Sequence, residues 1–145
     1  MTVLREAEAN EAAMNVSSSP RQVILCIDDD SEQLNLRTLA LSSAGYTVLT
    51  ATNAAAGLHL FTHNHVDLVI CDHVLPDAPG ADLLGEMKRF NPRVPVVLLS
   101  GFSETPAGVE QADIFLTKGM VVPDFLAAIA NLMSRKAKSA SNVNS

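Results

Sequence analysis

The chain has 145 residues, of which 48% are hydrophobic and 18% charged, so it is long enough for one domain with a buried core and little more. A formal net charge of −6 argues against a basic nucleic-acid-binding surface, so we expect no nucleic-acid partner. No apolar run approaches the length of a membrane span, and acids interrupt the segment where a secretory signal would lie. We therefore expect a cytoplasmic protein with no membrane partner.

The two ends of the chain are expected to be flexible. Residues 1–20 end with Ser17-Ser18-Ser19-Pro20. These residues break the short helix that the Ala- and Glu-rich N-terminal segment would otherwise form. Residues 135–145 consist mainly of Ser, Asn, Ala and Lys, a composition that forms a poor core. The folded domain is therefore predicted over residues 21–134.

Strands and helices alternate along this domain. Short apolar runs predict strands at residues 22–27, 46–50, 67–71, 95–99 and 113–117. Helices are predicted from Ser31 to Gly45, after the N-cap residue Asn53, over residues 81–90, and from Pro123 onward. Strand–helix alternations with right-handed crossovers make a doubly wound, three-layer α/β sandwich around a parallel sheet. Such sheets bind their ligands at the carboxyl ends of the strands.

Polar and charged residues directly follow four of the predicted strands. In chain order they are Asp28, Asp29, Asp30, Asp72, Ser100 and Lys118. The clustered acids repel one another, which costs free energy unless a cation neutralises them, and carboxylate oxygens suit Mg²⁺. A carboxylate beside such an ion can act as a nucleophile and form an acyl phosphate, while a hydroxyl and an ammonium group hold the phosphoryl oxygens. The sequence therefore predicts a phosphoryl site at this edge of the sheet.

Four segments of the sequence resemble the receiver domain of two-component response regulators, the CheY-like superfamily. They are VILCIDDD, DLVICDHVLPDAPG, VVLLSG and DIFLTKG, and the resemblance covers residues 21–133. Each segment is weakly specific alone, but the four in this order and register are highly specific. The resemblance implies a (βα)5 flavodoxin-like fold with strand order 2-1-3-4-5. It also implies a signalling domain rather than an enzyme, one that catalyses only its own aspartyl phosphorylation and dephosphorylation.

The resemblance gives the acids of the site their roles. Asp72 matches the phospho-accepting aspartate, followed in the family by a turn that matches Leu75-Pro76 and Gly80 here. Asp28 and Asp29 match the acidic pair that holds Mg²⁺. By this resemblance Asp29 and Asp72 ligate the ion directly, whereas Asp28 acts mainly through a metal-bound water. The backbone carbonyl of Val74 would be a further ligand.

The remaining matches concern the phosphoryl group and the switch. Ser100 matches the switch Ser/Thr, Lys118 the invariant lysine, and Phe115 the aromatic residue whose rotamer follows the Ser/Thr. A plain core position explains Phe115 equally well, so both interpretations stay open. Asp30 falls outside the acidic pair and is interpreted as a helix-start acid.

The sequence departs from the family pattern in two places. Gly119 stands where the family has a proline after the lysine, typically with a cis peptide bond, and a non-proline cis bond costs far more than a cis X–Pro bond. The segment from Ser100 to Lys118 is short by about one helical turn and contains Pro106 and Gly108, so the fourth helix is expected to be shortened.

Two apolar residues at the site predict a long-lived acyl phosphate. Val74 and Phe102 lie two residues beyond Asp72 and Ser100, and neither can orient an attacking water. We therefore expect slow self-dephosphorylation.

The resemblance also implies the partners. A histidine kinase or phosphotransfer protein would donate the phosphoryl group, and a downstream protein that the sequence does not name would bind the switched surface. No output domain is expected in this chain. A stand-alone protein, a fragment of a hybrid kinase and a homodimer all remain open.

Two other functions compete with this interpretation. Asp28-x-Asp30 after an apolar strand resembles the acid pair of haloacid-dehalogenase-like phosphatases, although the chain lacks room for the usual cap. The second alternative is a pseudo-receiver that only binds protein, to which Gly119 lends some support.

Two further residue pairs are candidate metal or redox sites. Cys26 and Cys71 are expected to be reduced and buried, yet neighbouring strands would permit a redox or metal pair. His59 and His63 have the i, i+4 spacing of a zinc pair on a predicted helix, but no third ligand is evident.

Overall fold

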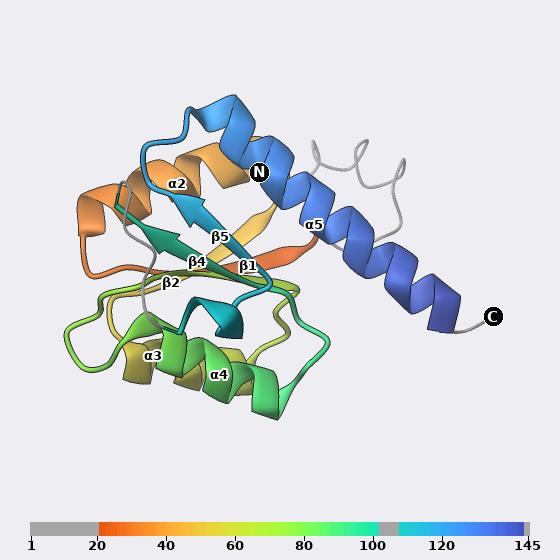
Figure 1. Cartoon of the computed structure of the whole chain (residues 1–145). Helices are drawn as coiled ribbons and strands as arrows, with labels where there is room; N and C mark the ends of the chain where they lie inside the picture. The colour runs from red at the N-terminus through yellow and green to blue at the C-terminus, as the bar shows by residue number, and fades with distance from the viewer. Residues whose placement is uncertain (1–20, 102–107, 144–145) are drawn as a thin grey trace, which may run out of the picture.

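In the computed structural model, which describes residues 21–101 and 108–143 (side chains to residue 135), five parallel strands form one sheet in the order β2-β1-β3-β4-β5 (Figure 1). This confirms the strand order implied by the sequence. The strands are β1 (Val23–Ile27), β2 (Thr47–Ala51), β3 (Leu68–Asp72), β4 (Val96–Ser100) and β5 (Ile114–Thr117).

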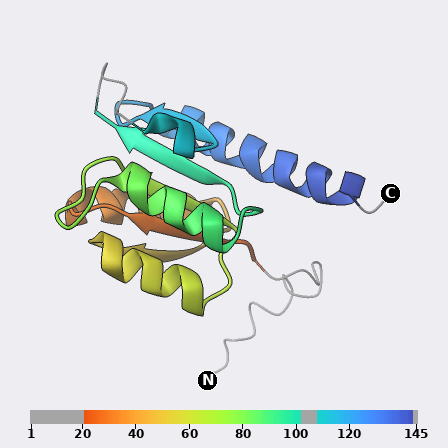
Figure 2. The same ribbon diagram turned by 60° about the horizontal axis from the view of Figure 1, so that its bottom comes forward.

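Helices cover both faces of the sheet and complete the three-layer sandwich. Figures 1 and 2 show α2 (Ser31–Ser43) and α5 (Val122–Val143) on one face, and α3 (Ala54–His63) and α4 (Gly80–Phe90) on the other. Between β4 and β5 the described residues form only a short 3₁₀ helix, η1 (Val109–Gln111). The expected shortening of the fourth helix is confirmed for this part of the segment.

The core lies on both faces of the three central strands, because their side chains alternate between the two helical layers. The layer of α3 and α4 packs against Leu25, Ile27, Val69, Cys71, Val96 and Leu98. The layer of α2 and α5 packs against Ile24, Cys26, Leu68, Ile70, Val97 and Leu99. From α5 the buried side chains are Phe125, Ile129, Leu132 and Met133, whose helical spacing places them on one face of the helix.

The last helix is longer than expected. α5 continues to Val143, so the backbone of residues 135–143 is helical where the sequence led us to expect a flexible tail; the domain boundary itself stays a prediction. A polar composition argues against core packing, but it does not prevent a helix from continuing. Once a helix has been nucleated, it can propagate through residues of good helix propensity such as Ala and Lys. The extension expected over residues 1–20, and Phe102 with Pro106, lie outside the described residues.

The loop between β3 and α4 is held close to the end of β3. Val74 and Pro79 form an isolated antiparallel bridge, and the Gly80 backbone N–H donates to the His73 carbonyl at 2.9 Å. A Cβ on Gly80 would lie 2.1 Å from the carbonyl oxygen of Asp72, so only glycine permits this approach. The loop therefore returns directly beneath Asp72.

The two cysteines cannot form a pair, although their strands are neighbours. Cys26 lies opposite Ile70 in the register of β1 and β3, and Cys71 lies opposite Ile27. Side chains alternate along a strand, so the two thiols point into opposite layers of the core. Both are free and buried, and burial raises the pKa of Cys26 to about 12.

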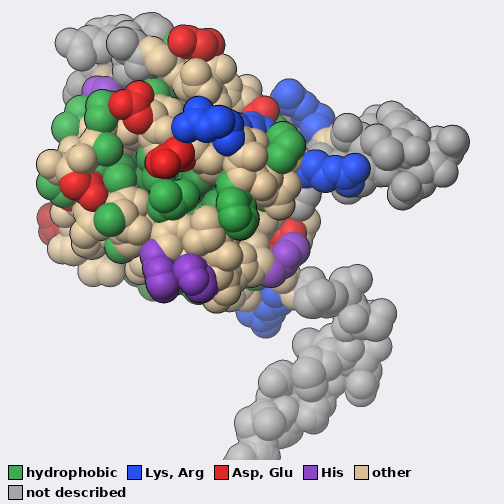
Figure 3. All heavy atoms as spheres, turned by 90° about the horizontal axis from the view of Figure 1, so that it is seen from below, with side chains coloured by type: hydrophobic (Ala, Val, Ile, Leu, Met, Phe, Trp, Pro, Cys, Tyr) green, Lys and Arg blue, Asp and Glu red, His purple; other side chains and the backbone are tan. Residues whose placement is uncertain are grey.

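His59 and His63 lie on the surface of α3, the side of the molecule that Figure 3 shows. Their rings stack with centroids 4.1 Å apart, and the ring Nδ1 of His63 lies 2.9 Å from the His59 carbonyl oxygen. Among the described residues no third His, Cys, Asp or Glu joins them in a metal-binding group. The pair is therefore a surface stack.

Candidate functional site

Three carboxylates meet where β1 and β3 end. Asp72 is the last residue of β3, and Asp28 and Asp29 directly follow β1. Because neighbouring parallel strands end at the same edge of a sheet, one ligand oxygen from each carboxylate lies within 4.8 Å of the others. Asp28 and Asp72 are buried, whereas Asp29 is exposed. The structure therefore brings together the three acids that the sequence places at one edge of the sheet, while their roles stay predictions.

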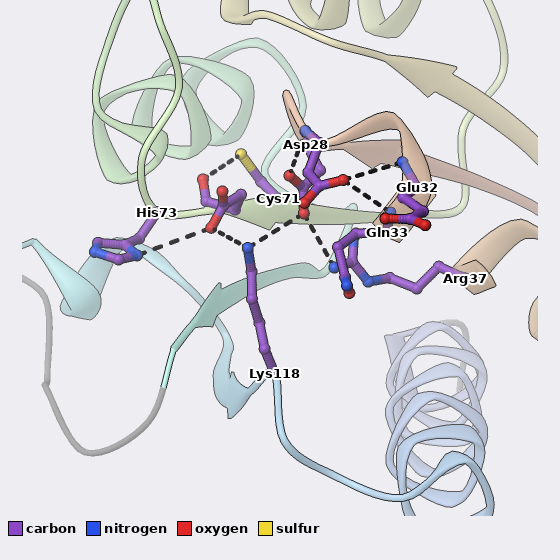
Figure 4. Close-up of polar contacts among 9 residues, drawn as sticks. Asp28, Glu32, Gln33, Arg37, Cys71, His73 and Lys118 are labelled. Atoms are coloured by element: carbon purple, nitrogen blue, oxygen red, sulfur yellow. Dashed lines mark hydrogen bonds and ion pairs between the residues drawn. The ribbon is translucent and has the colours of Figure 1, made fainter. Parts of the chain in front are cut away.

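Lys118 reaches these acids from the end of β5. Its Nζ lies 3.1 Å from Asp72 Oδ1 and 3.4 Å from Asp28 Oδ2 (Figure 4). Its backbone N–H donates to the Ser100 carbonyl at 2.8 Å, which ties the loop to the end of β4. The described residues contain no cis peptide bond, so the bond between Lys118 and Gly119 is trans. The lysine reaches the acids without the cis peptide typical of the family.

Asp28 is the most fully engaged of the acids. Its Oδ1 accepts the backbone N–H of Asp30 at 3.0 Å, and its Oδ2 accepts a hydrogen bond from Arg37 Nη2, also at 3.0 Å. Asp28 is fully buried, so these partners offset the loss of hydration of its charge. With every Asp28 oxygen engaged, the carboxylate has little freedom to reorient.

Arg37 is a site residue that the sequence reasoning missed. It lies on α2 with its side chain 11% exposed, and it extends toward the end of β1 (Figure 4). The available signal was a single cation among apolar positions of a helix predicted to pack on the sheet. Nothing in that pattern names the acid it pairs with.

Asp72 has a destabilised charge. Its burial, followed by the nearby charge of Asp28, raises the pKa of its carboxyl, and the hydrogen bond and charge of Lys118 lower it only in part. Burial and the neighbouring acid both destabilise the ionised form of this carboxylate. A cation bound beside it would therefore stabilise that form strongly.

His73 is a second residue that the sequence reasoning passed over. Its Nδ1 lies 3.9 Å from Asp72 Oδ1 and is buried with no hydrogen-bond partner among the described residues. The position next to Asp72 in the chain was the only signal. The strand's alternation directs the two side chains to different sides, so contact between them depended on the loop that follows.

Of the remaining predicted residues, Ser100 and Val74 lie at the same edge of the sheet, whereas Phe115 lies within β5, opposite Leu98 of β4. Ser100 is the last residue of β4, the strand that lies between β3 and β5. It is fully buried, and its Oγ donates a hydrogen bond to the Gly101 carbonyl at 3.3 Å. Phe115 is half-buried on β5 and packs against the layer of α3 and α4. Val74 is 58% exposed beside Asp72.

Asp30 does not join the acidic group. Its side chain accepts the backbone N–H groups of Glu32 and Gln33 as the N-cap of α2. The interpretation of Asp30 as a helix-start acid is confirmed. Asp30 is therefore engaged at the helix start and does not lie with Asp28 in the acidic group, as a haloacid-dehalogenase-like acid pair would require.

The donor set fits a hard divalent cation. Asp28, Asp29 and Asp72 offer only oxygen ligands, the type that Mg²⁺ prefers, and neither cysteine nor histidine belongs to the group. Asp72 and Asp28 carry charges that burial makes costly, and a cation would lower that cost.

Solved structures of response regulators, one of them described as CheY-like, share this fold. A receiver domain from Methanospirillum hungatei JF-1 superposes with a TM-score of 0.79 and 26% identity, covering 83% of this chain and 99% of that one. The response regulator TrrA from Thermotoga maritima, solved in complex with Mg²⁺–BeF, gives a TM-score of 0.72 and 26% identity over 77% of this chain and 98% of that one. The fold is therefore that of the CheY-like class.

The sequence comparisons name the family within this class. The model of the response regulator receiver domain matches residues 24–130, so the chain belongs to the response regulator receiver family. The transcriptional regulatory protein GlrR of Escherichia coli (strain K12) is 36% identical over 107 residues, which are 71% of this chain and 24% of GlrR. PrrA of Mycobacterium tuberculosis (strain ATCC 25618 / H37Rv) is 31% identical over 129 residues, 86% of this chain and 54% of PrrA.

The chain thus spans about a quarter of GlrR and about half of PrrA. No helix in the described ranges, 21–101 and 108–143, is long and apolar enough to cross a membrane.

Proposed function

We propose that this receiver domain accepts a phosphoryl group on Asp72 in a Mg²⁺-dependent reaction, with a histidine kinase or phosphotransfer protein as donor. One observation carries the proposal: Lys118 Nζ lies 3.1 Å from the buried carboxylate of Asp72, inside a group of acids that suits a divalent cation. Membership of the response regulator receiver family supports the same function.

The transfer is a substitution at phosphorus. A carboxylate oxygen of Asp72 forms a new P–O bond while the P–N bond of the donor phosphohistidine breaks. The bonding electron pair leaves with the imidazole, which takes up a proton from solvent. The product is an acyl phosphate on Asp72 and a neutral histidine on the donor.

The residues around Asp72 divide the work of this reaction. Asp28, Asp29, Asp72 and the backbone carbonyl of Val74 would hold Mg²⁺. The bound ion would neutralise charge on the phosphoryl oxygens. Lys118 is close enough to move its ammonium group from the Asp72 carboxylate to a phosphoryl oxygen. Burial of the Asp72 side chain limits competing water.

The switch is proposed to run from Ser100 toward β5. Ser100 lies on the strand between Asp72 and Lys118, so its hydroxyl can follow a new phosphoryl group. Phe115, half-buried on β5, is the residue through which that movement would reach the surface. The protein surface so altered would be read by a downstream protein.

Intact-mass spectrometry after treatment with an acyl phosphate or amidophosphate tests the proposal. With Mg²⁺ the native protein is expected to gain one phosphoryl group, and chelation of Mg²⁺ is expected to abolish the gain. Asp72→Asn should gain none, whereas Asp30→Asn should still gain it. Uptake by Asp72→Asn would refute the assignment, and uptake lost in Asp30→Asn would favour the phosphatase chemistry instead. A native protein that takes up no phosphate with Mg²⁺ would be a pseudo-receiver.

A further inference from the structure

Arg37 is a largely buried cation whose position packing does not explain. Its side chain is 11% exposed, and its Nη1 is buried without a hydrogen-bond partner among the described residues. Burying a guanidinium with an unsatisfied N–H costs free energy, so an apolar residue would fit this part of α2 better. The contact that offsets this cost is with Asp28, whose Oδ2 lies 3.0 Å from Nη2.

Arg37 changes the charge balance of the acidic group. The three carboxylates of Asp28, Asp29 and Asp72 face two cations, Lys118 and Arg37. One negative charge is left uncompensated. A divalent cation entering the group meets the repulsion of both resident cations, and beside the buried Asp28 and Asp72 this repulsion is less screened than between exposed charges.

The two cations act on different acids. Lys118 Nζ is closer to Asp72, at 3.1 Å, than to Asp28, at 3.4 Å. Arg37 donates a hydrogen bond to Asp28 Oδ2. With that oxygen already satisfied, Lys118 is free to favour Asp72, the group that it serves in phosphoryl transfer.

We propose that Arg37 is a positioning residue that fixes Asp28, directs Lys118 toward Asp72, and lowers the affinity of the acidic group for Mg²⁺. The proposal rests on the function proposed above, because it assumes that these acids bind Mg²⁺. It adds that this chain sets its metal affinity with a cation on α2.

Arg37→Met is the informative variant. Methionine has a similar length without the charge, and the side chain adjoins a cavity of about 200 Å³ that also touches Leu36 and Phe125, so the change does not overpack the core. Removing a unit charge a few ångströms from the ion is expected to tighten Mg²⁺ binding roughly tenfold. Arg37→Gln, also neutral, is expected to tighten binding as well. Arg37→Lys keeps the charge and is expected to stay within about threefold of the native value.

Isothermal titration calorimetry with MgCl₂ on the full chain measures these affinities. Arg93→Met is the matched control, because it removes the same charge from an exposed position near the far ends of α3 and α4. The rise of Tm with Mg²⁺ gives a second measurement of each affinity. Circular dichroism identifies any variant that fails to fold, and Arg37→Gln then replaces Arg37→Met.

The outcomes separate this inference from the proposed function. Tighter Mg²⁺ binding in the neutral Arg37 variants, with near-native affinity in Arg37→Lys and in Arg93→Met, supports the inference. Native protein that binds Mg²⁺ while the neutral variants bind it equally or more weakly overturns the inference alone. Equal tightening in Arg93→Met also overturns it, because net charge would then be the cause. If neither the native protein nor any variant binds Mg²⁺, the inference and the proposed metal site fail together.

Discussion

A substitution at Gly80 tests how the loop after β3 positions Asp72, the proposed phosphoacceptor. A Cβ at this position would lie 2.1 Å from the Asp72 carbonyl oxygen and 3.0 Å from its carbonyl carbon, whereas ordinary contacts begin at 3.4 Å. In Gly80→Ala the loop and the end of β3 must therefore separate by about 1 Å. Both sides of the contact are backbone, so no side chain can rotate to relieve it.

The resulting loss of stability follows from this separation. Overpacking of this kind costs about 1–3 kcal/mol of unfolding free energy, and the better helix propensity of alanine returns at most about 1 kcal/mol. The Tm is expected to fall by several degrees. Displacing Asp72 by about 1 Å is expected to slow phosphoryl uptake by up to ~10²-fold.

Thermal unfolding and the rate of phosphate uptake by intact mass measure the two effects. Gly101→Ala is the matched control, because a Cβ there meets nothing within 4 Å. Native Tm and native uptake in Gly80→Ala would refute the reasoning, since the close approach would then cost nothing. A lower Tm with native uptake would show that the loop moves without moving the carboxylate.

Two further predictions concern Asp72 and its surroundings. Burial and Asp28 raise the pKa of Asp72 above 3.8, so the stability contributed by its neutral form is complete below the unfolded pKa and is lost as the pH rises through the folded pKa. Without Mg²⁺, Asp72→Asn is therefore expected to have a higher Tm than the native protein at pH 7. This difference in Tm is expected to vanish below pH 3.8. A difference in Tm that does not change with pH would contradict the prediction. The proposed acyl phosphate is expected to persist well beyond seconds, because the exposed Val74 side chain cannot orient an attacking water. Val74→Asn is expected to shorten its lifetime. Intact-mass spectrometry follows the decay, and loss of the native acyl phosphate within seconds would rule this out.

The sequence alone determined the sheet and the convergence of its strand-end residues. Apolar runs alternating with amphipathic helices specify parallel strands buried on both faces, and parallel strands place their carboxyl ends at one edge. Asp28 and Lys118 directly follow their strands, and Asp72 is the last residue of its strand. Their meeting is therefore a consequence of topology, whatever the details of packing.

The tertiary structure decided the contacts made by long side chains and by loops. The pairing of Arg37 with Asp28 depends on how α2 packs over the end of β1, and that packing sums many weak contacts from residues far apart in the sequence. The same holds for the trans bond after Lys118 and for His73 beside Asp72. A sequence pattern assigns a residue to an element and a face, but only the packed chain fixes which charge a flexible cation meets.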